Sequence, residues 1–344
     1  MGSKHYVVVD FDPCKVSNIN EWNKLLMGLK ETSHKNWELF GTEIHDTSFH
    51  SKERYIHYFK LAWTLFRDRV NISAIVANQQ FYGIIFAFFC RLFHVKKTTK
   101  DIVVSFIYNK KNGLKGKIYE QFIKYSVQSK YVDKLIVHSE SEIDYYSKLL
   151  NIPKEKLVFC PLGITDDSEA YQIRRFPLLQ ESYVLGIGNS NRDFAFMENA
   201  LAGEEYEVRI FSDKVEEHNN HNVHVKKGIT VSEYYEQLAG AFCSIIPIDN
   251  PNFSSGQLIM LQSYAFEKPV IITQSKVNDE YVENGSAIVI QKDKDELLKA
   301  ISMLRDKKVY SEYVSKAKEF FDDKFSMYAM GCRLGKIIGE LDNG

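Results

Sequence analysis

Small polar residues and a glycine open a stretch of helical character in the second half of the chain. Ser254, Ser255 and Gly256 follow a strand-like run, residues 243–247, and precede Gln257 and an apolar segment. The free N–H groups and partial positive charge at the start of a helix attract phosphate. Serine also caps helices that bind no ligand. The pattern therefore indicates either a phosphate site or a simple helix cap.

A second set of candidates follows the strand-like run Tyr183–Gly188. Gly188 and Asn189 end this run, and Arg192 comes shortly after it. A guanidinium can bridge two phosphate oxygens, so Arg192 suits a diphosphate, whereas the alternative is a surface turn formed with Asp193. The Gly-x-Gly of this run lacks the third glycine of a dinucleotide fingerprint, which disfavours an NAD enzyme.

Further polar residues follow other strand-like runs. Lys214 comes after residues 207–211 and can reach a phosphate, although a lone lysine there is also typical of solvated surface. His138 comes after residues 135–137 as a candidate catalyst or as the neighbour of a helix cap. Three loop residues are candidates to bind acceptor hydroxyls: Asp12, Tyr108 and Asn109. Loop residues of this kind also serve simply to form turns.

Short β-branched runs alternate with longer amphipathic stretches along the whole chain. Such alternation predicts an α/β protein with parallel sheets. Apolar periodicity lapses in the polar stretch 163–180, between two complete sets of strands. We therefore expect two Rossmann-like domains facing a central cleft, residues 1–165 and 166–312, with C-terminal helices, residues 313–344, crossing back to the first domain. Ligands in such sheets lie beyond the carboxyl ends of the strands.

Composition excludes several classes of protein. The 344 residues carry a formal net charge of −1, which argues against a nucleic-acid partner. The five cysteines are widely spaced and odd in number, which indicates a reducing compartment rather than a disulfide framework or a zinc site. The N-terminus has no secretory pattern, and the longest apolar stretch, residues 81–93, is too short to span a bilayer. We therefore expect a cytoplasmic protein.

Two segments of the second half carry a family resemblance. Leu261–Ala265 and Lys268–Ile271 match the frame of the donor domain of retaining GT-B glycosyltransferases, and the chain resembles family 4, the glycosyl transferases group 1, in particular. In that family two glutamates eight positions apart face the donor sugar and the ribose. Here Ser254 and Gln262 stand at those positions. Gln262 can still bond a ribose hydroxyl, but Ser254 supplies no negative charge.

Other segments extend the resemblance over nearly the whole chain. Residues 183–194 are similar to the family's first donor-domain strand with its Arg-Asp turn, and residues 135–142 and 157–163 are similar to the end of its first domain. The resemblance implies that the backbone of Gly228 and Ile229 faces the nucleobase. Together with the helix start and the lysine described above, these segments predict a nucleotide-sugar site formed by Gly188, Asn189, Arg192, Lys214, Gly228, Ile229, Ser254, Ser255, Gly256, Gln257 and Gln262.

The implied activity is transfer of a sugar, with retention, from a nucleotide-diphosphate sugar to a glycan or lipid-linked acceptor in surface polysaccharide or glycoconjugate synthesis. Arg192, Ser254 and His138 are the expected catalytic residues. Beyond the donor substrate we expect no cofactor and no obligatory metal. Ser254 and Gln262 replace both family glutamates, and the loop that often carries a histidine in the family, here residues 106–109, has none. The alternative is therefore a non-catalytic, glycosyltransferase-like subunit that binds nucleotide sugar or a partner protein.

A basic segment adjoins the aromatic stretch 81–93. Residues 91–134 hold eleven Lys or Arg and three acids. Basic and apolar residues together favour an anionic membrane surface. We expect the apolar side chains of residues 81–93 to pack on the sheet, and the lysines to contact the inner face of the cell membrane or a lipid diphosphate: Lys96, Lys97, Lys110, Lys111, Lys115 and Lys117.

Overall fold

A computed structural model describes residues 4–43, 52–252, 255–283 and 285–343. The chain divides into two compact units. The amino-terminal unit comprises Met1–Pro161 and Met330–Gly344, and the carboxyl-terminal unit comprises Leu162–Ala329. The boundaries between the units thus follow residues 161 and 329, whereas the sequence predicted boundaries after residues 165 and 312.

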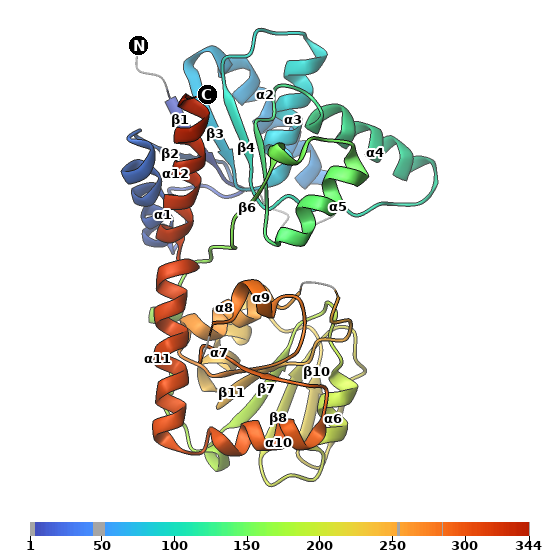
Figure 1. Ribbon diagram of the computed structural model, residues 1–344, viewed down its shortest axis with the longest axis vertical. Helices are drawn as coiled ribbons and strands as arrows, with labels where there is room; N and C mark the ends of the chain where they lie inside the picture. The colour runs from blue at the N-terminus through green and yellow to red at the C-terminus, as the bar shows by residue number, and fades with distance from the viewer. Residues whose placement is uncertain (1–3, 44–51, 253–254, 284, 344) are drawn as a thin grey trace. The chain divides into compact units, whose positions relative to one another are not determined.

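The amino-terminal unit is built on a six-stranded sheet in which every pairing is parallel (Figure 1). The strand order is β2-β1-β3-β4-β5-β6. The last two residues of β1, β3, β4 and β5 are apolar and buried, as expected of a parallel sheet covered on both faces. The last strand, β6, was not among the predicted strands. The strands are β1 (Lys4–Val8), β2 (Glu38–Phe40), β3 (Ile72–Ala77), β4 (Lys100–Val103), β5 (Lys134–Val137) and β6 (Leu157–Phe159).

Helices cover both faces of this sheet. On one face α2, α3 and α4 pack side by side, and on the other the start of α12 lies against α1, where Gly331 meets the backbone of Leu25. Within α3, Ile84 and Ile85 are buried as predicted, but Leu92 at its end is exposed. The helices are α1 (Ile19–Ser33), α2 (Lys52–Asp68), α3 (Gln80–Leu92), α4 (Gly113–Val127), α5 (Glu140–Leu150) and α12 (Met327–Asn343), with 3₁₀ turns at Arg69–Asn71 and Lys154–Lys156.

The carboxyl-terminal unit is built on a seven-stranded sheet. The order is β13-β12-β11-β7-β8-β10-β9, and only β9, at the edge, runs antiparallel among the described strands. The sequence did not predict β9. The strands are β7 (Tyr183–Ile187), β8 (Glu207–Phe211), β9 (His218–Asn220), β10 (Val223–Lys226), β11 (Cys243–Ile246), β12 (Val270–Thr273) and β13 (Ile288–Ile290).

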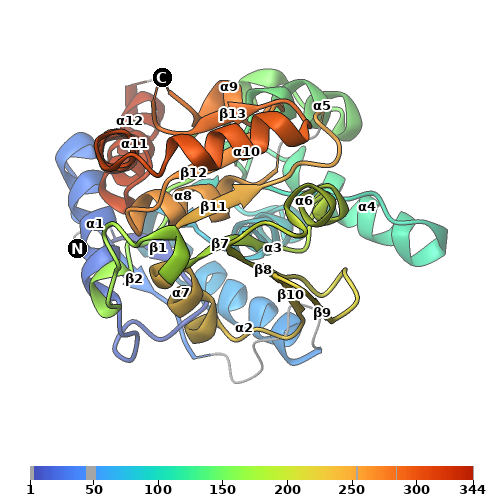
Figure 2. The ribbon, with the colours of Figure 1, turned by 90° about the horizontal axis from the view of Figure 1, so that it is seen from below.

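Two helical layers enclose this second sheet. Helices α6 and α10 pack together on one face, and α8 packs with α11 on the other (Figure 2). Among the described residues, no helix is both long and apolar enough to cross a bilayer. The helices are α6 (Phe194–Leu201), α7 (Val231–Gly240), α8 (Gln257–Ala265), α9 (Asn278–Tyr281), α10 (Lys294–Met303) and α11 (Lys307–Lys324), with 3₁₀ turns at Ser168–Ala170 and Leu179–Glu181.

Candidate functional site

The loops that follow β7, β8 and β10 are joined by hydrogen bonds at the carboxyl edge of the second sheet. Asn189, after β7, donates from Nδ2 to Asp213 Oδ2 at 2.8 Å and accepts the Asp213 N–H at 2.7 Å. The other carboxylate oxygen of Asp213 accepts the Gly228 N–H at 3.0 Å. Because Asp213 bonds to both loops, it brings Asn189 and Gly228 together, with Ile229 half-buried beside them.

Arg192 lies in the same loop cluster and has no carboxylate partner among the described residues. Its Nη1 donates to the carbonyl of Ser190 at 2.7 Å and, at 3.4 Å, to the hydroxyl of Ser255. Its Nε is buried and has no hydrogen-bond partner within the described part of the chain. Burial lowers the pKa of Arg192 to about 10, so the guanidinium stays charged at neutral pH. A buried, unneutralised cation with a donor to spare suits an anionic ligand.

Two glycines leave the space around this guanidinium. A Cβ on Gly188 would lie 3.4 Å from Arg192 Nε, and one on Gly256 would lie 3.5 Å from Nη2. Both glycines have positive φ, 129° and 100°. Gly256 is also the N-cap of α8 and has no side chain to bond the first N–H groups of the helix. The start of α8 and Arg192 therefore form one electropositive corner. Ser254 lies outside the described residues.

Asn191 ties the loop after β7 to the loop after β11. Its backbone is left-handed, with φ 55°. Its Nδ2 donates to the carbonyl of Asn250 and to the hydroxyl of Ser255, each at 3.0 Å, and its Oδ1 accepts the Asn250 N–H at 2.8 Å. Asn191 was not among the predicted site residues. The signal that favours it is an asparagine between a glycine and an arginine after a strand, since asparagine tolerates this backbone conformation.

Gln262 of α8 is engaged by two tyrosines of α7. Tyr234 donates its hydroxyl to Gln262 Oε1, and Gln262 Nε2 lies 3.3 Å from the Tyr235 hydroxyl. The Tyr235 hydroxyl in turn lies 3.2 Å from Asp167 Oδ2. Burial raises the pKa of both phenols, that of Tyr235 to about 12, so both stay neutral. The two tyrosines were not predicted as site residues, because nothing in the sequence of α7 distinguishes them from core aromatics.

Lys214 is exposed and lines the same hollow as Arg192. Its backbone N–H donates to the Ser212 hydroxyl at 3.2 Å, which fixes the start of its loop. The hollow measures about 530 Å³, and four acidic residues also line it: Asp193, Glu198, Glu216 and Asp249. Lys292 pairs with Asp193 at 2.9 Å, which offsets part of the negative charge.

The predicted acceptor residues of the amino-terminal unit have different environments. Asp12 accepts the Cys14 N–H at 3.0 Å and forms a turn. Tyr108 is 1% exposed and stacks on Tyr119, so its ring does not face solvent. Asn109, by contrast, is exposed. Of the three, Asn109 is thus the residue with an accessible side chain in an open loop.

His138 makes two hydrogen bonds through its ring. Nε2 lies 2.8 Å from the hydroxyl of Ser105, and Nδ1 lies 2.8 Å from the carbonyl of Cys160. Ser105 follows β4 with a positive φ of 54°, and it was not a predicted site residue. Because both ring nitrogens are occupied within the protein, His138 is placed to orient Ser105 rather than to touch a substrate.

Asp10 and Asp12 stand two apart, in an Asp-x-Asp sequence of the kind whose carboxylates can bind a divalent cation. Asp10 Oδ2 accepts from Arg54 Nη2 at 2.5 Å and is neutralised by this ion pair. Across the described ranges, no three His, Cys, Asp or Glu side chains are grouped as metal ligands.

Comparisons with known proteins give structural relatives only. No family model matches the chain, and no curated protein sequence matches it. A glycosyltransferase from Rickettsia africae is similar over 100% of both chains, with TM-score 0.59 and 12% identity. The sucrose-phosphate synthase of Thermosynechococcus elongatus is similar over 99% of both chains, with TM-score 0.61 and 12% identity. HepE of Anabaena, solved with UDP and glucose, is similar over 98% of this chain and 99% of its own, with TM-score 0.57 and 11% identity.

The chain has the GT-B fold. This confirms the predicted α/β architecture of two Rossmann-like domains. At these identities the likeness establishes the fold alone, so each role in the site depends on the geometry given above.

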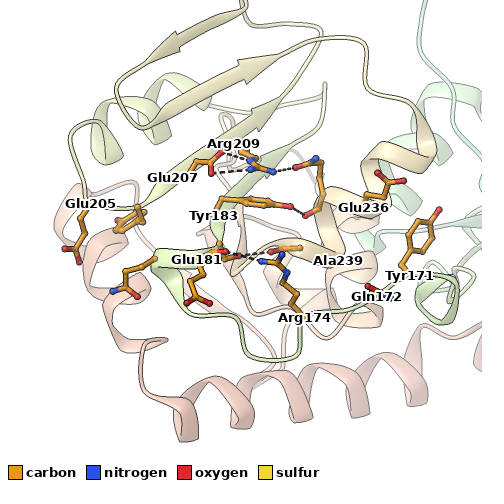
Figure 3. A pocket seen from close by; sticks show the side chains of 15 residues that line it. Tyr171, Gln172, Arg174, Glu181, Tyr183, Glu205, Glu207, Arg209, Glu236 and Ala239 are labelled. Carbon is orange, nitrogen blue, oxygen red and sulfur yellow. Dashed lines mark hydrogen bonds and ion pairs between the residues drawn. The ribbon is translucent and has the colours of Figure 1, made fainter.

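A hollow of about 660 Å³ in this GT-B chain lies away from the candidate site, at the amino ends of β7 and β8 (Figure 3). Tyr183 begins β7 and Glu207 begins β8. Arg209 Nε donates to Glu207 Oε1 at 2.6 Å, and the guanidinium lies 3.7 Å from the centre of the Tyr183 ring. Arg209 is thus neutralised, whereas Arg174, the second arginine of this hollow, donates to the Glu181 carbonyl at 3.1 Å. The hollow lies at the amino ends of the strands, away from the edge where ligands of such sheets bind.

Proposed function

We propose that this protein is a glycosyltransferase that moves a sugar, in particular a hexose, from a nucleotide-diphosphate sugar to a glycan or lipid-linked acceptor. We further propose that transfer retains the anomeric configuration and serves surface polysaccharide or glycoconjugate synthesis on the cytoplasmic side of a membrane. The observation that carries the proposal is the Arg192 guanidinium, which is charged, has a buried and unpartnered Nε, and lies between Gly188 and Gly256.

In this proposal the protein stabilises the leaving diphosphate. Arg192 and the first N–H groups of α8 are preorganised donors, and their attraction for the diphosphate grows as negative charge develops during bond cleavage. Lys214 adds a second, exposed cation to the lining of the hollow. Gln262, held by Tyr234 and Tyr235, orients the ribose, and Gly228 and Ile229 contact the base. The nucleotide is thus fixed at three points, which positions the sugar for in-line attack.

On the acceptor side we propose that α4 and the loop before it contact an anionic membrane surface. Helix α4 extends away from its unit in both views (Figures 1 and 2). Leu114 and Ile118 are 76% and 63% exposed. They alternate with exposed lysines, each worth about 1 kcal/mol near an anionic surface. Lys97 differs because it pairs with Asp133 at 2.5 Å, so it is a weaker candidate. The exposed lysines are Lys96, Lys110, Lys111, Lys115 and Lys117.

A thermal-shift series with UDP, GDP, CMP, ADP and dTDP, each with and without magnesium, tests the donor site. A ligand that binds only the folded state raises its stability by RT ln(1 + [L]/Kd). We expect one nucleoside diphosphate to raise the Tm without magnesium, and Arg192→Ala to abolish the shift. Arg305→Ala removes an exposed arginine from the same unit, one that pairs with Glu205 at 2.7 Å, and should keep the shift. A shift that requires magnesium would contradict the expectation of a metal-free site.

Binding without turnover would favour the alternative, a non-catalytic subunit. This alternative is motivated by Ser254 and Gln262, which stand where the family that the chain resembles has two glutamates. Release of free sugar or its transfer to a simple acceptor, measured with the nucleotide sugar whose base gave the Tm shift, separates the two functions. If Arg192→Ala abolishes both sugar release and sugar transfer, the result would support a transferase.

Sedimentation with anionic liposomes at low salt tests the membrane contact. We expect the protein to pellet, and a double variant, Lys115→Glu with Lys117→Glu, to stay in the supernatant. Lys299→Glu with Lys308→Glu makes the same charge change in the carboxyl-terminal unit and should still pellet. Failure of the unmodified protein to pellet would contradict this part of the proposal.

A further inference from the structure

An apolar groove of about 570 Å³ lies between α2 and α3 on the outer side of the amino-terminal unit. Three of its side chains are large, apolar and exposed: Ile56 by 55%, Phe59 by 42% and Trp63 by 39%. Single exposed apolar side chains are ordinary, but a contiguous concave group of them marks a binding surface. The lining residues are Tyr55, Ile56, Phe59, Lys60, Trp63 and Phe89.

Ring contacts hold the walls of the groove in place. The Phe89 ring of α3 lies 5.0 Å from that of Trp63 and 6.2 Å from that of Phe59. Phe93, just past the end of α3 and 53% exposed, continues the surface at 5.9 Å from Trp63. The groove is therefore preformed, so little ordering opposes the entry of a ligand.

One charged residue, Lys60, lines the groove. Among the described residues it forms no ion pair, and it lies one helical turn from Ile56 on the exposed side of α2. From Tyr55 to Trp63 the groove follows α2 for roughly 12 Å, at 1.5 Å per residue. Its shape is that of an apolar channel with a single free cation on its rim.

The start of α2 brings one end of this channel to the edge of the sheet where ligands bind. Arg54, next to Tyr55, donates to Asp10 in the loop after β1, at the carboxyl edge. In doubly wound sheets this edge carries the ligand site. A molecule whose polar end lies at this edge can extend an apolar chain along Ile56, Phe59 and Trp63.

We propose that this groove binds the hydrocarbon chain of a lipid phosphate, with Lys60 paired to the phosphate. The inference rests on the proposed function and deepens it, because it makes the acceptor a sugar carried on a lipid phosphate. A protein partner fits less well, since a stable interface takes about 20–30 residues from each side and this groove offers six.

Trp63 provides a direct probe of hydrocarbon in the groove. It is one of three tryptophans, and Trp37 is 6% exposed. Bromine quenches indole fluorescence only at contact. We expect dibromododecyl phosphate, added below its critical micelle concentration, to quench fluorescence saturably, and Trp63→Phe to lose this quenching. Inorganic phosphate should have no effect.

A second experiment tests the charge of Lys60 separately from the binding of the hydrocarbon. Lys60→Gln should weaken binding of dibromododecyl phosphate about fivefold, the upper range for an exposed ion pair, and leave binding of dibromododecyl maltoside unchanged. Lys299→Gln removes an exposed lysine of the other unit and should change neither affinity. Lys60 is exposed, so its substitution does not disturb the core and remains informative if an aromatic variant fails to fold.

Three outcomes overturn the inference. They are absence of quenching below the micelle concentration, quenching that appears only with vesicles, and a concentration-dependent dimer that Ile56→Ser dissolves, which would assign the groove to a second copy. Failure of the proposed function gives a different pattern. In that case no nucleoside diphosphate shifts the Tm, while the brominated lipid still quenches Trp63.

Discussion

The hydroxyl of Ser105 lies 2.8 Å from Nε2 of His138, and this contact has a defined direction. Nδ1 of the same ring lies 2.8 Å from the Cys160 carbonyl oxygen, which can only accept. Burial lowers the pKa of His138 below its usual 6.5, so at neutral pH the ring is neutral and carries its proton on Nδ1. Ser105 must therefore donate to Nε2, which leaves the serine oxygen as an acceptor for a further hydroxyl.

We predict that histidine-labelled protein shows His138 as the Nδ1-protonated neutral tautomer in ¹³C and ¹⁵N NMR at pH 7. Ser105→Ala removes the hydrogen bond that stabilises the neutral ring, so the pKa of His138 should rise. Ser139→Ala, at a neighbouring serine, should leave that pKa unchanged. A ring protonated on Nε2, or one that titrates at 6.5 in the unmodified protein, would contradict the assignment.

Most of the fold was predictable because the strands contain short runs of β-branched and other apolar residues that alternate with longer amphipathic stretches. Glu207–Phe211 was predicted at its observed bounds, and the other central strands were placed within two or three residues. The missed strands lie at sheet edges: β6 has three residues, and β9 (His218–Asn220) is entirely polar. An edge strand needs burial on fewer sides, so its sequence carries a weaker signal.

The candidate site was predictable only as a set of loops. Arg192, Gly188 and Gly256 follow strands, so topology alone brings them to one edge. Asn191, Asp213 and Tyr234, however, act through hydrogen bonds to residues 15 to 59 positions away. Side-chain partners at such separations depend on register and helix packing, which a single sequence does not encode in any local pattern.

We predict that Gly256→Ala abolishes nucleotide binding while costing only moderate stability. With φ 100°, alanine is strained there by roughly 1–2 kcal/mol, and its Cβ would lie 3.1 Å from Ile246 Cγ2. Gly203→Ala is the matched control, because Gly203 has φ 85° and nothing within 4 Å of its Cβ position. Both variants should lose Tm, but only Gly256→Ala should lose the nucleotide shift. If the nucleotide raises the Tm of both variants equally, Gly256 is not part of the nucleotide site.

Asp101 leads to a prediction about acid stability. Its carboxylate is fully buried, and neither oxygen has a hydrogen-bond partner among the described residues. Burial, with Asp133 nearby, raises its pKa well above 3.8 despite Lys97 and Lys156. The folded state then binds a proton that the unfolded state releases, so stability falls as pH rises from 3.8 toward the folded pKa.

We therefore expect the unfolding free energy of Asp101→Asn, relative to that of the unmodified protein, to increase as pH rises across that window. The increase should be at most about 1.4 kcal/mol per pH unit. Asp68→Asn is the control, because hydrogen bonds from Asn71 and Lys4 lower the pKa of Asp68 below 3.8. Its pH-dependent contribution therefore lies below that pH, and its gap to the unmodified protein should change little from pH 4 to 7. Urea unfolding from pH 4 to 7 measures both. A gap between Asp101→Asn and the unmodified protein that does not change with pH would show that Asp101 does not titrate in this range.

Lys268 gives the corresponding prediction at alkaline pH. It is fully buried, and its Nζ donates to the Arg174 carbonyl at 2.6 Å. Burial lowers its pKa to about 7, so between pH 7 and 10.5 the unfolded state binds the extra proton and stability rises with pH. Lys268→Met removes this slope, so its Tm relative to the unmodified protein should be highest near pH 7 and fall toward pH 10. Lys318→Met is the control: burial lowers the pKa of Lys318, but Asp322 and Asp166 outweigh it and raise that pKa above 10.5. Lys318 is then protonated in both states from pH 7 to 10, so the Tm difference between Lys318→Met and the unmodified protein should stay constant over that range. Parallel pH dependence of Lys268→Met and the unmodified protein would mean that Lys268 remains protonated, and hence that water reaches it inside the unit.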